Sequence, residues 1–583
     1  MTREPLGERR VSRRWMLGAM GASAGAAGLA ALRCSNGSPK PPTATPGAED
    51  GTTVTPGSSP TPRPQQDGKR GETLRYTAFI VRDNSFDPHK TQSAPLYGFQ
   101  SMIYSRLLAY QDQAKGVIVP DLAAQMPETP DAQTAIFRLN PNARWHDLPP
   151  LNGRPVTAQD VKYSVERQLA GGAAFARSAQ WAVIDSIEAG DERTITFKLK
   201  TPMAGLLNLF AAPQSFIVAP ETAGDKNDIG SATQVGSGPF QWVEWTDGRL
   251  ASVRRNPSWH GGDGRPNLDG VSLVQPESSA VVEARFRTKE LDAAVVGRQL
   301  ATRLRERIPQ LTETTMGHSQ FFGMRFSLVN DPYNDLRFRT AVTIALDRRA
   351  MIDKFYGGSG GVNPWVSWPM MDWALPESEL TTYAGYRPGD GGRAEDLKEA
   401  AALLAAFKAE KPVKDDLPMF VVDETEAALQ FGQTIKEQLA ANLGLEQVRV
   451  VPLPLSELSN LLISGTAPWA AGADNGWIDL DDWVYPYFHA DGTKNSFPLR
   501  DAEVTSMIDA QRVELDKAKR REIGYNIQRR LLALNAGVNL FSERVVALTW
   551  PYVKGLPLDT ADGYQHRFAD TWIDTSDATF RGR

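Results

Sequence analysis

Cysteine and histidine are both scarce in this chain. Its 583 residues include one Cys and six His. A single Cys cannot form an intrachain disulfide, and zinc or iron–sulfur sites built from several cysteines are excluded. The six His are scattered along the sequence and form no ligand pattern, so we expect neither a bound metal nor a cofactor.

A surplus of positive charge and long apolar runs are also missing. The formal net charge is −5, which argues against nucleic acid as a partner. Beyond the N-terminal region, the longest uncharged stretch runs from Thr201 to Pro220, and its Pro, Asn and Gln residues argue against a membrane span. Neither H-E-x-x-H nor a Walker A pattern occurs, and we identify no strand–turn–helix nucleophile elbow.

The first 34 residues have the pattern of an export signal. Five arginines precede an uncharged run rich in Ala and Gly, from Trp15 to Leu32, and a basic segment before a short apolar one is typical of such signals. Residues 12–17 read S-R-R-W-M-L and resemble the twin-arginine pattern; a permanent anchor helix is the alternative. Cys34 stands where a bacterial lipoprotein cysteine would be acylated, although Arg33 replaces the usual small residue. We predict an export signal over 1–34 and a lipid anchor at Cys34.

Residues 35–70 are predicted to be a disordered tether. They include 8 Pro, 6 Thr, 5 Gly and 4 Ser, with Val54 as the single large aliphatic residue, so they have too little apolar surface to offset the entropy cost of ordering. An anchor followed by a tether suits a body held near the outer face of a membrane. Without residues 1–34 the chain carries 58 basic and 67 acidic residues, a net charge of −9, which favours a neutral or cationic ligand over a polyanion.

From residue 71 onward, strand and helix patterns alternate. Apolar and polar residues alternate as in half-buried strands at 74–81, 135–139 and 195–199. Thr157 and Asp160 are suited to cap a helix with a stripe of apolar residues on one face. Interleaved strands and helices predict an α/β fold. Further helices are expected over 335–345, 347–355, 395–410 and 424–443, and two more within 502–534.

Eight short motifs follow one another between residues 71 and 348. They are Gly71–Leu74 with Phe86–Pro88, Ile103–Leu108, Pro120–Ala123, Phe137–Leu139 with Trp145–Asp147, Thr157–Arg167 (TAQDVKYSVER), Val235–Phe240 (VGSGPF), Arg255–Trp259, and Asp335–Arg348. Each motif alone is weak. Their order and spacing together resemble those of the family 5 extracellular solute-binding proteins, the peptide- and nickel-binding components of ABC importers, over nearly all of 71–550.

The resemblance implies a type II periplasmic-binding-protein fold, in which two lobes joined by a hinge close on a ligand. We expect lobe I over 71–315 with an extra subdomain at about 106–230, lobe II over 316–540, and a return of 541–583 to lobe I. The implied function is that of a monomer outside the cytoplasm, which captures a peptide or similar small solute and delivers it to the permease subunits of an ABC importer. No catalysis is implied.

Gly236, Gly238 and Pro239 directly precede a predicted strand at 240–245. The glycines would allow the positive φ angles of a sharp turn. Such a turn is a candidate hinge, where a few residues absorb a large change in backbone angles. A simple tight turn is the alternative.

The resemblance also places an acidic ligand site in residues 476–483, which read G-W-I-D-L-D-D-W. Asp479 falls where the family pairs a carboxylate with the ammonium group of a peptide, and Asp482 falls at a second acidic place, while Trp483 replaces the usual Pro. A buried carboxylate beside a ligand cation would form a charge-assisted hydrogen bond. The alternative is a set of solvated carboxylates that cap the next helix.

Aromatic residues gather near the same segment and in the loop after the 347–355 helix. Aromatic walls suit a cationic ligand with an apolar body, although any one of these rings could instead pack in a core. The candidates are Trp365, Trp368, Trp477 and Trp483. By analogy with the family, Phe86 would face the cleft, and Arg325 would meet an anionic group or form a salt bridge.

Two other functions remain open. One is an exported hydrolase, for which a glycosidase pair would need two carboxyl groups about 5–5.5 Å apart at a sugar site. The other is a surface sensor or chaperone on the same fold. A metal chelate, a heme or an oligosaccharide are alternative ligands.

Overall fold

The structure is a computed structural model that describes residues 70–580, except 81, 83, 84, 92, 114, 225, 226, 263, 277, 363–369, 424, 425, 476–478, 493–498 and 558–564. The predicted export signal at 1–34, its Cys34, and the tether at 35–70 apart from Arg70 lie outside the described residues. Among the helices of the described part, none combines the length and apolarity needed to cross a bilayer.

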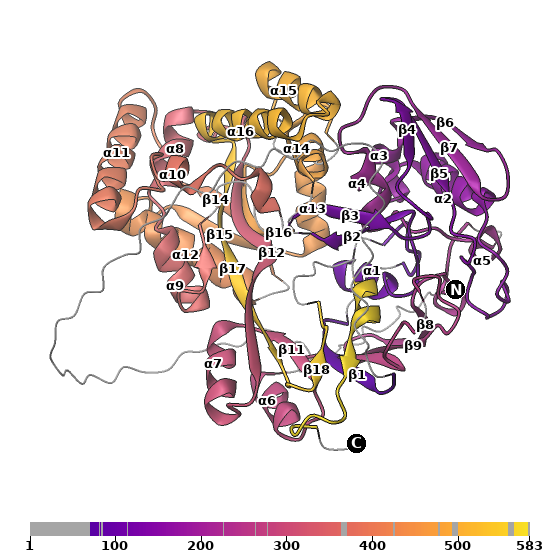
Figure 1. The fold of residues 1–583 in the computed structure, drawn as a ribbon. Helices are drawn as coiled ribbons and strands as arrows, with labels where there is room; N and C mark the ends of the chain where they lie inside the picture. Colours follow the sequence, from indigo (N-terminus) through magenta and orange to yellow (C-terminus); the bar gives the residue numbers. More distant parts are fainter. Residues whose placement is uncertain are drawn as a thin grey trace, which may run out of the picture. The chain divides into compact units, whose positions relative to one another are not determined.

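One large sheet runs through the described chain (Figure 1). Its 11 strands follow the order β15-β14-β16-β12-β17-β11-β1-β10-β9-β8, with β13 paired to β17. Their bounds are β15 Val448–Leu453, β14 Leu417–Val422, β16 Trp469–Asn475, β12 Thr312–Phe326, β17 Gly537–Thr549, β11 Ala293–Val296, β1 Thr73–Thr77, β10 Gly270–Val274, β9 Leu250–Arg255, β8 Phe240–Thr246 and β13 Gly360–Gly361.

The long strands β12 and β17 connect the two ends of this sheet. The start of β12 pairs with the end of β17, from Thr312 with Thr549 to Gly317 with Arg544. After a register shift between Gly317 and Phe321, the rest of β12 pairs with β16 and with the start of β17. The end of β17 also pairs with β11. Each long strand therefore contributes to both ends of the sheet.

Two separate hydrophobic cores cover the two ends of the sheet. One is built from strands β1 and β8 to β11 with α6, α7 and the C-terminal segment. The other surrounds β12, β14 and β16 and is closed by α8, α9, α11, α12, α14, α15 and α16. The helices are α6 Ser279–Arg287, α7 Arg298–Arg307, α8 Leu336–Ile344, α9 Arg348–Tyr356, α11 Gly389–Glu410, α12 Glu426–Leu443, α14 Leu480–Phe488, α15 Ala502–Val513 and α16 Lys517–Leu534.

A third core lies within residues 107–235, under a small sheet of order β4-β5-β7-β6. Phe210 lies at its centre, with its ring centroid 4.7 Å from that of Phe137, 4.8 Å from that of Phe197 and 5.5 Å from that of Trp181. The elements are β2 Leu108–Asp112, β3 Val117–Pro120, β4 Glu128–Asp131, β5 Thr134–Arg138, β6 Ile184–Ala189, β7 Thr194–Leu199, α2 Ala158–Gly171, α3 Ser178–Trp181, α4 Leu206–Ala211 and α5 Pro220–Ala223. The extra subdomain predicted at about 106–230 overlaps this core, and its bounds stay a prediction.

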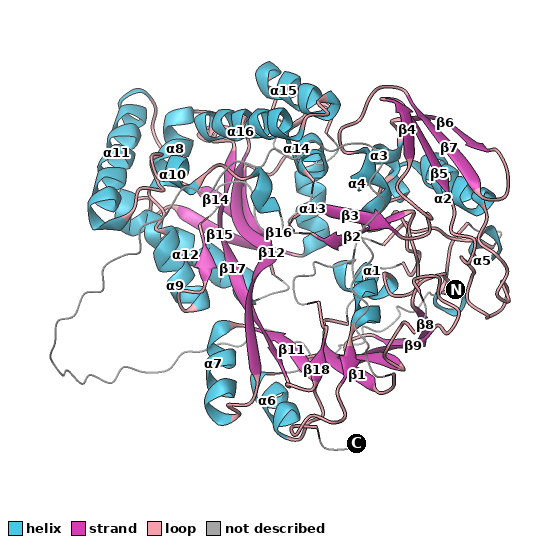
Figure 2. Cartoon of the chain, viewed as in Figure 1, coloured by secondary structure: helices cyan, strands magenta, loops and turns pink. Residues whose placement is uncertain are grey.

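The remaining elements are short, except for α13 and α1 (Figure 2). They are α1 Ala94–Gln100, η1 Gly172–Ala174, η2 Ser231–Thr233, η3 Met370–Trp373, α10 Glu377–Leu380, α13 Leu455–Ile463, β18 Val553–Lys554, η4 Gln565–Asp570 and β19 Trp572–Ile573.

Several predicted helix starts agree with the structure. Thr157 and Asp160 form a capping box at the start of α2, and Asp335 and Asp347 cap α8 and α9 through their side chains. The helix predicted at 395–410 begins six residues earlier, after Pro388. Arg387, just before the helix, donates to Asp396 and Glu399 at 2.7 and 3.0 Å.

The prediction that Gly236 and Gly238 provide positive φ angles is wrong. Neither residue has a positive φ angle. A Cβ atom on Gly236 would instead lie 2.0 Å from the carbonyl oxygen of Ile103, and one on Gly238 would lie 2.7 Å from the carbonyl carbon of Ile103. Glycine is required because two backbones approach closely. Buried His146 holds the same segment through Gly236 N–H and the Gly238 carbonyl.

Candidate functional site

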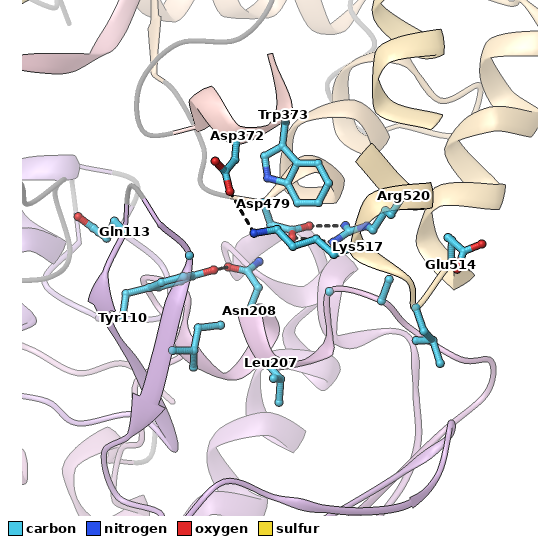
Figure 3. Close-up of a pocket in the computed structure, with 15 residues that line it drawn as sticks. Tyr110, Gln113, Leu207, Asn208, Asp372, Trp373, Asp479, Glu514, Lys517 and Arg520 are labelled. Carbon is cyan, nitrogen blue, oxygen red and sulfur yellow. Dashed lines mark hydrogen bonds and ion pairs between the residues drawn. The ribbon is translucent and has the colours of Figure 1, made fainter. Parts of the chain in front are cut away.

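A cavity of about 250 Å³ lies where strands β2 and β3 and helix α4 meet the start of α14 and helix α16 (Figure 3). Its lining comes from two stretches of the chain that are far apart in sequence. The residues are Tyr110, Gln113, Gly116, Ile118, Ala204, Gly205, Leu207 and Asn208 from the first stretch, and Asp372, Trp373, Asp479, Glu514, Leu515, Lys517 and Arg520 from the second.

Asp479 is a buried wall of this cavity and pairs with Arg520. Its Oδ1 accepts from Arg520 Nη2 at 2.6 Å and from the Asp481 N–H at 2.9 Å, and its Oδ2 accepts from Arg520 Nη1 at 2.9 Å. The bond from the Asp481 N–H makes Asp479 the N-cap of α14. Burial alone would raise the pKa of Asp479, but the charge and hydrogen bonds of Arg520 outweigh it, and the pKa lies below its usual value.

Arg520 is held rigidly on three sides. Its Nε donates to Gln511 Oε1 at 3.0 Å, and its guanidinium lies over the Trp373 ring at 5.0 Å from the centroid. It lies on the buried face of α16, together with Gly524, Ile527 and Leu531. Among the described residues, the hydrogen-bond and ring partners of Arg520 named here all belong to the second stretch of the chain.

Two further carboxylates follow Asp479 on α14. Asp481 Oδ1 accepts from Gln511 Nε2 at 2.6 Å and lies 3.2 Å from Arg512 Nε. Asp482 Oδ2 accepts from Asn208 Nδ2 at 2.8 Å, and its Oδ1 lies 3.6 Å from Arg177 Nη2. Burial raises the pKa of both groups, that of Asp481 to about 6, because Arg512 and Arg177 compensate only in part and the neighbouring carboxylates repel.

Polar contacts join the two walls of the cavity. Asn208 of α4 donates to Asp482 and accepts from the Tyr110 hydroxyl at 2.7 Å. The backbone N–H of Ala204 donates to the Arg512 carbonyl at 2.6 Å. At the mouth, Lys517 Nζ lies 3.0 Å from Asp372 Oδ2 (Figure 3). The cavity thus combines two ion pairs with amide and hydroxyl groups, which suits a small polar ligand.

The described residues give no indication of a metal-binding site, in this cavity or elsewhere. No group of three or more His, Cys, Asp or Glu side chains is arranged there to hold a metal ion.

Comparison with known proteins decides the family. Residues 117–496 match the bacterial extracellular solute-binding proteins, family 5 (middle). The match spans more than half of the chain. This chain belongs to that family.

Individual relatives are distant. A Brucella ovis protein named as an ABC transporter peptide-binding protein is 28% identical over 290 residues, 48% of this chain and 53% of the relative. The chain thus matches about half the length of that relative. The periplasmic oligopeptide-binding protein OppA of Salmonella typhimurium is 27% identical over 410 residues, 64% of this chain and 72% of OppA.

Solved structures of other binding proteins show the same fold. The oligopeptide-binding protein AppA of Bacillus subtilis, determined with a nonapeptide, has a TM-score of 0.71 at 16% identity and covers 87% of this chain and 99% of AppA. The predicted fold, type II periplasmic-binding-protein α/β, is confirmed.

The structure brings some of the predicted site residues together. Asp479, Asp482 and Trp483 all belong to the start of α14. Asp479 lines the cavity. Asp482 does not line it but accepts a hydrogen bond from Asn208, which does. Trp483 packs in the core beside Phe488, with ring centroids 5.4 Å apart. The alternative interpretation of the acidic segment was correct about the cap, but the carboxylates are buried rather than solvated.

The other predicted residues lie elsewhere. Among the described residues, neither Phe86 nor Arg325 lines the cavity. Phe86 packs edge-on against Trp242 with its centroid 5.8 Å away, and Arg325 lies over the Tyr487 ring at 5.2 Å. Trp365, Trp368 and Trp477 lie outside the described residues.

Sequence reasoning missed Arg520, Lys517 and Asn208. A signal for Arg520 was present, because residues 520, 524, 527 and 531 form one helical stripe that is otherwise apolar or small. A charged residue on such a stripe requires a buried partner. The stripe does not reveal that the partner is Asp479, 41 positions earlier.

Proposed function

We propose that this family member is the substrate-binding component of an ABC importer, and that it holds its ligand in the cavity beside Asp479. The observation that supports this is a buried ion pair that faces a cavity between two distant stretches of the chain. A structural pair has no need of such a cavity. In this proposal the protein binds and delivers a solute and catalyses no reaction.

The ligand is proposed to be a peptide or similar small solute with an ammonium group. Asp479 Oδ2 accepts one hydrogen bond from Arg520 among the described residues, and a carboxylate oxygen has room for about two. The ammonium group would take the remaining place, with Asn208 and Tyr110 as further polar contacts. The relatives whose names or structures mention peptides support this class.

The proposed movement is the closure of two lobes. Lobe I would comprise 71–315 and 541–583, with an extra subdomain at about 106–230, and lobe II would comprise 316–540. Strands β12 and β17 pair within both ends of the sheet, and bending there would separate the cavity walls for ligand entry and rejoin them on closure. The role of Gly236, Gly238 and Pro239 as a hinge remains a prediction.

The proposed location is outside the cytoplasm, on the outer face of the cytoplasmic membrane or in the periplasm. The export signal at 1–34 and a lipid at Cys34 would provide it, and the permease subunits would be the partners of a monomer. A Cys34→Ala change would release the protein from the membrane fraction, and unchanged fractionation would contradict the lipid anchor.

An exported hydrolase is less well supported. Residues 357–361 read G-G-S-G-G, a G-x-S-x-G pattern, but they follow helix α9 rather than a strand. The Ser359 hydroxyl donates to the Arg544 carbonyl at 2.8 Å. A nucleophile elbow instead holds its serine between a strand and a helix.

Scattering and mass measurements test the proposal together. Native mass spectrometry of freshly purified protein would show a bound mass, because a closed cleft retains its ligand. Adding that compound to ligand-free protein would reduce the radius of gyration in small-angle scattering. Saturation without any compaction would contradict closure, and hydrolysis of the compound would contradict a binding-only role.

A further inference from the structure

We infer that the cavity recognises the headgroup of a free α-amino acid, with the ligand carboxylate on Arg520 and the ligand ammonium group on Asp479. This inference rests on the proposed function and deepens it. It differs from recognition of a peptide amino terminus, because in a peptide the carboxyl group next to the first amine is a neutral amide.

The hydrogen-bond capacity of the pair is only partly used. Arginine has five N–H donors, and the described residues occupy three of those on Arg520, at Gln511 and at the two oxygens of Asp479. The carboxylate of Asp479 accepts three bonds of about four. One donor on each terminal nitrogen of Arg520 and one acceptor place on Asp479 Oδ2 are therefore not used by the described residues, and both residues line the cavity.

The charges that line the cavity are already nearly balanced. Asp479 faces Arg520, and Asp372 faces Lys517. Glu514 lies near the rim, where its side chain accepts from the Asp516 N–H at 2.8 Å. A ligand with only an ammonium group would take the open place on Asp479 Oδ2, but it would add a net positive charge to the cavity and leave the unused donors of Arg520 without an acceptor. A ligand with both charges satisfies the unused places without breaking the pair.

The spacing of the two groups favours an α-amino acid. Arg520 Nη1, which keeps one unused donor, lies 2.9 Å from Asp479 Oδ2, which keeps the open acceptor place. This donor and acceptor therefore lie on adjacent atoms, whereas the unused donor on Nη2 is on the opposite edge of the planar guanidinium. An α-amino acid carries its ammonium and carboxylate on one carbon and can reach both. The termini of a longer peptide are separated by its backbone and cannot both contact this one pair.

The remaining walls and the size of the cavity fit a single side chain. Ile118, Leu207 and Trp373 provide apolar surface beside the pair, and Leu515 at the rim is 61% exposed. A volume of about 250 Å³ lies just below the range of about 300–1,000 Å³ for pockets that hold drug-sized ligands. One apolar or aromatic side chain would bury this surface.

A thermal-shift screen tests the inference directly. The full mature chain, freed of any co-purified compound, is measured with each of the twenty free α-amino acids, with the C-terminal amide of each, and with Ala-Ala and Ala-Ala-Ala. We expect at least one free amino acid to raise the melting temperature, and its amide to bind at least tenfold more weakly in calorimetry.

Two variants of helix α16 separate recognition from stability. Arg520→Gln should abolish the preference for the acid over the amide. Arg529→Gln removes a similar two-bond pair, with Glu379 at 2.7 and 2.8 Å, outside the cavity, and should keep that preference. If Arg520→Gln retains it, or if Arg529→Gln loses it equally, Arg520 does not bind the carboxylate.

The failures of the two proposals are distinguishable. The inference is wrong if no free amino acid shifts the melting temperature, or if acids and amides bind equally. If only the peptides bind, the substrate-binding function stands and the amino-acid headgroup is excluded. If native mass spectrometry finds no bound mass and no compound of the screen binds, the proposed function fails as well.

Discussion

Two buried arginine–aspartate pairs in this molecule have the same chemistry and different surroundings. Arg167 and Asp87 lie between α2 and the chain after β1, with side chains 1% and 0% exposed, whereas those of Arg520 and Asp479 are 6% and 10% exposed. Arg167 uses all five of its donors, at both oxygens of Asp87, at His89 Nδ1, and at the side chain and carbonyl of Asn227. Arg520 uses three.

The acceptors differ in the same way. Besides Arg167, Asp87 accepts from the backbone N–H groups of His89 and Ile229, at 3.0 and 3.1 Å, so its four places are filled. Asp479 keeps one place open beside a cavity. Unused hydrogen-bond capacity next to a cavity, rather than a buried ion pair as such, is therefore the feature that sets the proposed binding site at Asp479 apart from the pair at Asp87.

The largest expected loss of stability follows from breaking the Arg167–Asp87 pair, which has no unused hydrogen-bonding place and is called the closed pair below. Asp87→Ala leaves Arg167 buried without its counter-charge, and breaking a buried pair in this way costs about 3–5 kcal/mol. Urea unfolding should show a loss of this size. A loss below about 1 kcal/mol would mean that water reaches Arg167, and the contrast between the two pairs would disappear.

A pH-dependent effect is expected at Asp481. Burial raises its pKa to about 6 in the folded protein, against about 4 in an unfolded chain. A raised carboxyl pKa means that its contribution to stability is full below pH 4 and is lost as the pH rises through 6, a change of about 3 kcal/mol.

Asp481→Asn removes this titration and keeps an oxygen that can accept from Gln511. The free energy of unfolding of the variant, minus that of the wild type, should increase between pH 4 and pH 7 in parallel urea titrations. Titrating groups that do not interact with Asp481 cancel in this difference. Two parallel pH profiles would show that Asp481 is not desolvated.

A smaller loss of stability is expected from breaking the Arg520–Asp479 pair, which keeps unused hydrogen-bonding places beside the cavity. Asp479→Ala removes a helix cap and the partner of Arg520, but the cavity admits water to Arg520, so we expect about 1–2 kcal/mol in urea unfolding. Asp501→Ala is a matched control, because Asp501 caps α15 and lies 2.7 Å from Arg530 Nη2. Neither residue of this pair lines the cavity. A loss as large as that of Asp87→Ala would show that the two pairs are equally closed.

The smallest effect is expected at the mouth of the cavity. The side chains of Lys517 and Asp372 are 56% and 44% exposed, and exposed pairs contribute about 0–1 kcal/mol. Lys517→Gln should therefore leave the urea midpoint almost unchanged. A shift that corresponds to more than 1 kcal/mol would indicate that this pair also holds the walls together.

The sequence was sufficient to predict the fold and to locate Asp479, but not the residues that pair with the acidic segment. Caps such as Thr157, Asp335 and Asp347 are local signals, and the structure has helices at all three. Asp479 could be located because the resemblance fixes its position in a motif. A local sequence pattern does not identify partners that are distant in the sequence. Arg520 is 41 positions from Asp479, and Asn208 is 274 positions from Asp482.

The error at Gly236 has a related cause. A glycine in a sequence indicates either a positive φ angle or a close approach, and the two can be told apart only when the opposing backbone is known. Here that backbone is Ile103, more than 130 positions earlier. The fold therefore had to be known before the reason for the residue could be.

The central claim is that ligand binds beside Asp479, and native mass spectrometry tests it most directly. Wild type, Asp479→Ala and Asp501→Ala are purified in parallel, and the fraction of each that carries a bound mass is compared. We predict a bound fraction in wild type and Asp501→Ala, and a roughly tenfold lower one in Asp479→Ala, since a charged hydrogen bond contributes about 1.5–3 kcal/mol. Equal bound fractions in all three proteins would contradict the account.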